Sequence, residues 1–128
     1  MPFGSGWVEG EFAYPAAETR ARLTKLGNVV VIEEDILALR EPSRYGIGEV
    51  AVCHVDVDLY EPAAVALEFL SRCAWAEVFV RFDDWHGGEP EYDQHERLAF
   101  SEWVERYGYG YEVVYGGMAG GALVRRNR

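Results

Sequence analysis

The stretch CHVDVDLYEP, residues 53–62, decides the fold that this sequence predicts. It completes an apolar run that begins at Val50, and it places two carboxylates, Asp56 and Asp58, where that run ends. A short apolar run bounded by polar residues is typical of a buried strand. Pro62 suits the first turn of a helix, where a backbone N–H has no helical partner. The stretch therefore predicts a strand, an acidic turn and a helix in succession.

A second stretch repeats the pattern of an apolar strand followed by two acids. Residues 78–82 read VFVRF, and Asp83 and Asp84 follow them directly. The carboxyl ends of parallel strands open on the same edge of a sheet, which is where ligands bind in open α/β folds. We therefore expect both acid pairs to lie close together.

The rest of the chain alternates between helical and strand patterns, and it ends in two short strands around a glycine-rich turn. Helices are expected over residues 15–26, 63–71 and 94–107, and strands over 28–32, 50–55, 78–82, 111–115 and 122–124. This order indicates an α/β fold with a mostly parallel sheet and a C-terminal antiparallel hairpin. The β-branched run at 28–32 predicts a strand buried on both faces, whose terminal acids join the same sheet edge. His54, inside an apolar strand, is expected to be buried.

Length and composition limit the classes of protein that this chain can belong to. Its 128 residues suffice for a single domain over 1–128, and the 49% hydrophobic content indicates a globular protein. The net charge of −10 disfavours binding to nucleic acids or to anionic membrane surfaces. The two cysteines, Cys53 and Cys73, form no metal-binding pattern, so we expect free thiols and a cytoplasmic protein.

The paired carboxylates predict a site for a hard divalent cation. Carboxylates held close together repel each other unless a proton or a cation is present, and oxygen ligands suit Mg²⁺, Mn²⁺ or Ca²⁺. A carboxylate not used as a ligand could act as a general base. The alternative is that each aspartate caps the turn or helix that follows it. Two strand ends with paired acids favour the metal site over capping.

Three further residues border the acid pairs. Tyr60, Trp85 and His86 could line a substrate pocket there. Core packing is the commoner use of the two aromatic residues, and a plain surface position is an equal alternative for the histidine.

The quoted motifs resemble the macrocin O-methyltransferase family. DVDLYE at residues 56–61, a helix, and FDDW at 82–85 are similar to the corresponding motifs of these class I enzymes, which methylate sugar hydroxyls with S-adenosyl-L-methionine. The resemblance extends from about Gly6 to the end and includes WVEGEFA at residues 7–13. It implies a truncated Rossmann-like fold that corresponds to the C-terminal two-thirds of a class I methyltransferase.

The resemblance also implies roles for individual residues. Asp56, Asp83 and Asp84 would bind Mg²⁺, and Asp58 would be the base that deprotonates a small-molecule hydroxyl acceptor. The adenine-contacting positions of the family match Glu34, Asp35 and Ile36. The family's first strand, glycine-rich turn and second strand have no match here. A homodimer or a completing N-terminal partner chain would therefore supply the rest of the cofactor site.

Other readings of the same motifs remain open. The chain could be a non-catalytic remnant of the methyltransferase fold that binds metal or dimerises. The DVD motif could also belong to a metal-nucleotide glycosyltransferase, although Asp83 and Asp84 would then have no role. A phosphatase of the D-x-D-x-T kind fits poorly, because Tyr60 occupies the threonine position.

Overall fold

The structure, a computed structural model, describes residues 16–86 and 94–126, so residues 7–13 of the family resemblance lie outside the described part. The chain divides into two units, residues 1–33 and 34–128. The first contains α1 (Ala16–Thr24), which confirms the helix predicted over 15–26. Gly27 follows it with a φ of 78°, the left-handed conformation common where helices end.

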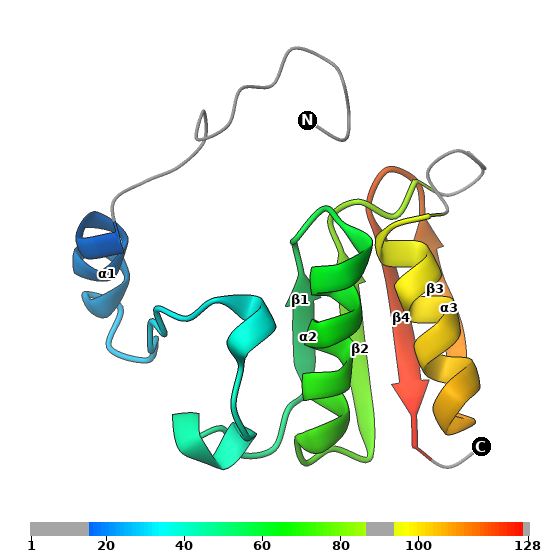
Figure 1. Cartoon of the computed structure of the whole chain (residues 1–128), viewed down its shortest axis with the longest axis horizontal. Helices are drawn as coiled ribbons and strands as arrows, with labels where there is room; N and C mark the ends of the chain where they lie inside the picture. Colours follow the sequence, from blue (N-terminus) through cyan, green and yellow to red (C-terminus); the bar gives the residue numbers. More distant parts are fainter. Residues whose placement is uncertain (1–15, 87–93, 127–128) are drawn as a thin grey trace. The chain divides into compact units, whose positions relative to one another are not determined.

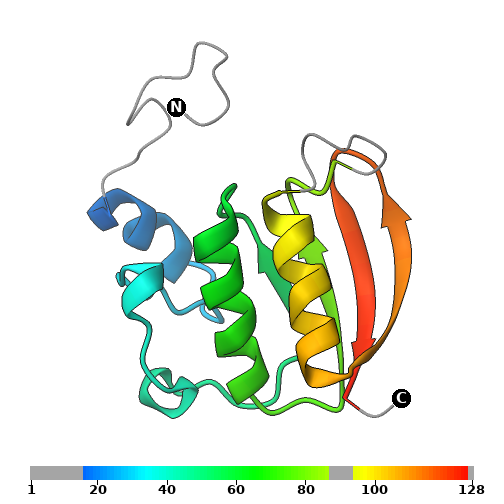
Figure 2. The same cartoon turned by 45° about the vertical axis from the view of Figure 1, so that its right-hand side comes forward.

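The second unit is a four-stranded sheet with two helices side by side on one face (Figures 1 and 2). The strands lie in the order β1-β2-β4-β3. Among the helices of the described residues, none is long and apolar enough to cross a lipid bilayer. The elements are η1 (Ile36–Ala38), η2 (Pro42–Tyr45), β1 (Val52–Val55), α2 (Tyr60–Arg72), β2 (Glu77–Phe82), α3 (Glu96–Tyr107), β3 (Gly110–Gly116) and β4 (Gly120–Arg125).

The α/β class and the C-terminal antiparallel hairpin are confirmed, but the sheet is less parallel than the sequence predicts. Among the named strands of the described residues, only β1 and β2 pair in parallel and the other two pairings are antiparallel, because β4 inserts antiparallel between β2 and β3. The predicted strand at 28–32 is wrong: residues 29–35 are neither helix nor strand, and Val30 is 79% exposed. A β-branched run becomes a strand only beside a partner strand, and the described residues offer it none.

The acids after this run therefore do not lie at the edge of a sheet. Asp35 begins η1 instead, and its side chain accepts a hydrogen bond from the N–H of Leu37 at 2.9 Å. Glu34 accepts one from the hydroxyl of Tyr45 at 3.4 Å. Both residues thus have local structural partners.

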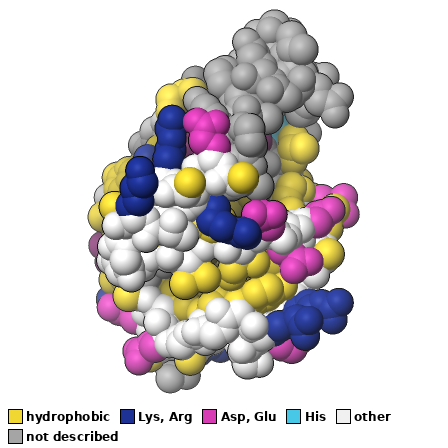
Figure 3. All heavy atoms as spheres, turned by 90° about the vertical axis from the view of Figure 1, so that its left-hand side faces the viewer, with side chains coloured by type: hydrophobic (Ala, Val, Ile, Leu, Met, Phe, Trp, Pro, Cys, Tyr) yellow, Lys and Arg dark blue, Asp and Glu magenta, His cyan; other side chains and the backbone are white. Residues whose placement is uncertain are grey.

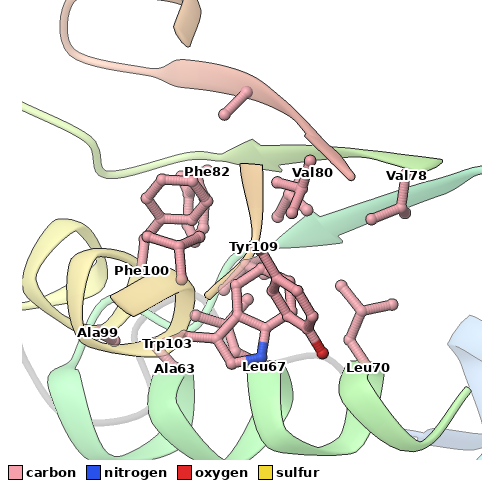
Figure 4. Packing of buried hydrophobic residues seen from close by; sticks show 14 of the residues in the cluster. Ala63, Leu67, Leu70, Val78, Val80, Phe82, Ala99, Phe100, Trp103 and Tyr109 are labelled. Atoms are coloured by element: carbon pink, nitrogen blue, oxygen red, sulfur yellow. The ribbon is translucent and has the colours of Figure 1, made fainter. Parts of the chain in front are cut away.

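The core lies between the sheet and the two helices (Figure 4). Val78, Val80 and Phe82 alternate along β2 and are fully buried on the helix side. They meet Leu67 of α2 and an aromatic group from α3 that includes Trp103. Each such side chain contributes about 1.5–3 kcal/mol through burial, so this layer stabilises most of the unit.

Arg126, just after β4, forms hydrogen bonds that link the end of the sheet to the end of α2. Its guanidinium donates to the carbonyls of Ser71 at 3.0 Å, Cys73 at 2.6 Å and Trp75 at 2.6 Å. It also lies 4.0 Å from the centre of the Trp75 ring. Carbonyls at a helix C-terminus lack helical partners and carry partial negative charge, so a cation there stabilises the helix end.

Candidate functional site

Four aspartates converge at the carboxyl ends of β1 and β2. The parallel register pairs the last residues of the two strands, so the acids that follow them emerge side by side. Ligand oxygens of Asp56, Asp58 and Asp84 all lie within 4.8 Å of one another, and Asp83 forms a similar group with Asp56 and His54. The convergence predicted from the two motifs is therefore present.

Burial and mutual repulsion alter the acidity of this cluster. A hydrogen bond from its side chain to Asp84, together with partial burial, raises the pKa of Asp58 to about 6. Burial raises the pKa of Asp84, and burial followed by the charge of Asp83 raises that of Asp56. The raised pKa values show that full ionisation of these carboxylates is unfavourable, and a bound cation would stabilise the ionised group.

The turn between β1 and α2 aims Asp58 into the cluster. Its φ of 66° is left-handed, a conformation that aspartate tolerates better than most residues. The residue that caps α2 is Leu59, which offers no side-chain hydrogen bond to the helix. Asp58 therefore does not serve as the helix cap that was the alternative explanation for it.

Glu96 is a member of the site that the sequence analysis does not identify. It is the first residue of α3 and is 0% exposed. Its carboxylate accepts hydrogen bonds from the N–H groups of Val57 at 3.1 Å, Asp58 at 2.8 Å and Asp84 at 3.1 Å. A glutamate in the first turn of a helix is common because it complements the helix dipole, so its sequence position carries no signal of this role.

The residues predicted to line a substrate have different surroundings. The Tyr60 hydroxyl donates to Glu102 of α3. Trp85 is 4% exposed, with its ring centroid 5.3 Å from that of Phe82, so it packs in the core. His86 is buried beside the cluster, with Nε2 3.5 Å from Oδ1 of Asp84. This distance places His86 beside a carboxylate of the cluster.

A cavity of about 310 Å³ adjoins the cluster on the side of β1 away from β2. Its lining is mainly apolar and comes from η1, β1 and α2, with Asp56 and His54 among its few polar residues. Ile36 lines it, whereas Glu34 and Asp35 do not. Cys53 also lines it, and burial raises the pKa of that thiol to about 11. Of the three predicted cofactor contacts, only the isoleucine shares a cavity with the acid cluster.

The outer edge of β1 is open among the described residues. The carbonyls of Ala51 and Val55 accept hydrogen bonds from Phe79 of β2 and from Asp83 directly after it. The backbone groups of Val52 and His54 therefore point the other way. Val52 is 63% exposed, and hydrophobic side chains reach the surface on this side of the protein (Figure 3). His54 is exposed rather than buried, and its Nδ1 lies 3.2 Å from Arg81.

No protein-family model and no curated protein matches this chain. Among solved structures, the chain is similar to the crystal structure of a SAM-dependent methyltransferase from Aquifex aeolicus, with a TM-score of 0.54 and 22% identity. This chain shares that protein's fold. The match covers 85% of this chain and 60% of the solved chain, so this chain spans about three-fifths of the length of that methyltransferase.

Proposed function

We propose that this chain is part of an S-adenosyl-L-methionine- and Mg²⁺-dependent O-methyltransferase that acts on a hydroxyl of a sugar or a similar small molecule. The observation that carries the proposal is the convergence of Asp56, Asp58 and Asp84 at the carboxyl edge of a methyltransferase-like sheet. The sequence resemblance to the macrocin O-methyltransferase family supports the hydroxyl acceptor.

The donor set fits a magnesium ion. Carboxylate oxygens from two adjacent loops are hard ligands, and Mg²⁺ is usually held by one or two carboxylates together with water or substrate oxygens. Asp56, Asp83 and Asp84 are the proposed ligands; Asp56 belongs to both groups of neighbouring donor atoms, one with Asp83 and His54 and one with Asp84 and Asp58. When bound, the ion would lower the pKa of a coordinated acceptor hydroxyl.

Asp58 is the proposed general base. Its pKa of about 6 leaves it ionised at neutral pH yet basic enough to accept a proton from an acidified hydroxyl. Its left-handed backbone directs it toward the other carboxylates. His86, 3.5 Å from Asp84, and the neighbouring Tyr60 and Trp85 are proposed to shape the acceptor side of the site.

The residues present fit only part of S-adenosyl-L-methionine. The apolar cavity with Ile36 and Phe69 suits the flat face of adenine, and Asp56 lies at the same cavity. Glu34 and Asp35 are proposed as further cofactor contacts from the segment that leads into η1.

We propose that a partner strand pairs with the open edge of β1 and completes the cofactor site. The outward backbone groups of Val52 and His54 and the adjacent apolar cavity support this. The partner is a second copy of this chain or a polypeptide that carries the N-terminal part of the fold. Free Cys53 and Cys73 support a cytoplasmic location for this assembly.

The test is calorimetric titration of S-adenosylhomocysteine into the purified chain, with and without Mg²⁺, alongside sedimentation analysis. Binding with a Kd of about 1–100 μM, in the usual range for enzyme ligands, supports the proposal, and dependence on a dimer identifies the partner as a second copy. Val52→Lys, which charges the open edge, should then lower both dimerisation and binding. Failure to bind at millimolar ligand contradicts a self-sufficient methyltransferase.

The same measurement addresses the second candidate, a metal-binding or dimerising module without turnover. The open edge of β1 favours this candidate, since an unpaired edge strand promotes association. Mg²⁺ binding without any S-adenosylhomocysteine binding, in the dimer as in the monomer, would support the module over the enzyme.

A further inference from the structure

The buried carboxylate of Glu96 connects three segments that meet at the acid cluster. One oxygen, Oε2, accepts the N–H groups of Val57 and Asp58, which lie 39 and 38 residues away in sequence. The other oxygen, Oε1, accepts the N–H of Asp84, which lies 12 residues away. The loop after β1, the loop after β2 and the start of α3 are thus held by a single side chain.

These bonds hold the backbone of the two loops that carry the candidate ligands and the candidate base, Asp58. Asp58 is in the left-handed region, a conformation that persists only when its surroundings maintain it. Its N–H makes the shortest of the three bonds, 2.8 Å, and its side chain then reaches the neighbourhood of Asp84. Without the bond to Glu96, the turn would lose an interaction that maintains its left-handed conformation.

A carboxylate suits position 96 because both of its oxygens can accept hydrogen bonds. A glutamine has one accepting oxygen and a donating amide group, which would face an N–H of Val57, Asp58 or Asp84 without forming a bond. An aspartate is shorter by one methylene. Burial raises the pKa of the Glu96 carboxyl, and the three N–H groups that it accepts oppose this rise by stabilising the ionised form.

We infer that Glu96 is the positioning residue of the candidate cation site, because it holds both acidic loops in place before any cation binds. The inference rests on the proposed function of the aspartates as cation ligands. Glu96 does not itself contact the cation in this role. It acts through the main chain: it accepts the N–H of Asp84, a proposed ligand, and those of Val57 and Asp58, the two residues that follow the proposed ligand Asp56.

The experiment compares wild type with Glu96→Gln and with Glu105→Gln, an exposed glutamate of the same helix. Mg²⁺ affinity is measured by calorimetry, and the amide signals of Val57, Asp58 and Asp84 are followed by NMR. Glu96→Gln should weaken Mg²⁺ binding by about 10–100-fold, the usual cost of losing a group that orients metal ligands. It should also shift these amide signals and accelerate their hydrogen exchange, while Glu105→Gln leaves both readouts unchanged.

The outcomes separate this inference from the proposed function. Absence of Mg²⁺ binding by wild type contradicts the proposed function. Normal binding by Glu96→Gln, in a wild type that does bind, overturns this inference alone. If the variant does not fold, hydrogen exchange of the Val57, Asp58 and Asp84 amides in cation-free wild type provides the test instead. Slow exchange at these amides supports the positioning role of Glu96. Fast exchange that slows only when Mg²⁺ is added overturns it.

Discussion

The two parallel strands of this sheet, β1 and β2, pair with each other but differ in how completely they are buried. Val78, Val80 and Phe82 of β2 are fully buried between α2, α3 and the neighbouring strands, whereas Val55 is the only buried residue of β1. The interior strand β2 is thus covered by other elements of the same chain. The edge strand carries a cavity and outward-facing backbone groups. The difference indicates that most of the burial that stabilises the unit lies on the β2 side of the acid cluster.

The largest expected effect comes from removing a core aromatic residue on the complete side. Phe82→Ala should lower the free energy of unfolding by about 3–5 kcal/mol, because a large cavity forms between Trp85 and Phe100. Val52→Ala on the open edge should change it by about 0.5 kcal/mol or less. Urea denaturation measures both. Equal losses would show that the open edge is as important to stability as the core; Phe82→Leu serves if the alanine variant does not fold.

A smaller effect is expected at the hairpin that closes the same side. A Cβ on Gly120 would lie 2.3 Å from the Trp85 ring, whereas one on Gly117 would meet nothing closer than 4.0 Å. Gly120→Ala should therefore destabilise the protein by about 1–3 kcal/mol through overpacking. Gly117→Ala is the matched control, and thermal denaturation compares the two. A neutral Gly120→Ala would indicate that Trp85 moves aside without cost.

At the acid cluster, we expect that a proposed cation ligand can be changed without loss of stability. Asp84→Asn keeps the N–H that Glu96 accepts but removes a charge, so Mg²⁺ affinity should fall by at least about tenfold, or about 1.4 kcal/mol. The free energy of unfolding without cation should stay the same or rise, because repulsion in the cluster decreases. Glu112→Gln, on exposed β3, is the control. Unaltered affinity would remove Asp84 from the ligand set.

The smallest effect is the pH dependence contributed by Asp58. Its pKa rises from 3.8 to about 6 on folding, so the folded state binds the proton more tightly than the unfolded state. Its contribution to stability is therefore present at low pH and is lost as the pH rises through this window. Because the residue is partly exposed, we expect less than about 1 kcal/mol. Denaturation at several pH values without divalent cations should show this slope, and Asp58→Asn should reduce it, because the raised pKa values of Asp56 and Asp84 contribute with the same sign.

The sequence predicts well those elements whose structure depends on residues close to one another in the chain. The helices α2 and α3 and the strand β2 follow from apolar periodicity, a proline near one helix start and a glycine after the other. The meeting of Asp56 with Asp83 follows from a simple rule, since both residues leave adjacent parallel strands at their carboxyl ends.

The sequence predicts poorly those features that depend on contacts with residues distant in the chain. Residues 28–32 have strand propensity, but no described strand lies beside them to form a ladder. His54 lies in an apolar run yet is exposed, because its side chain lies beside that of Arg81 on the face of the sheet opposite α2 and α3. Glu96 resembles any glutamate in a first helical turn, and its role depends on loops 12 to 39 residues away.

The contacts of Arg126 have a consequence for the order in which the unit folds. Its three carbonyl partners lie 51 to 55 residues earlier in the chain, so these bonds form only after the last strand has joined the sheet. Interactions that appear after the transition state slow unfolding without accelerating folding. We therefore expect Arg126 to set how long the native state persists, while the rate of reaching it depends on the helices and strands that precede it.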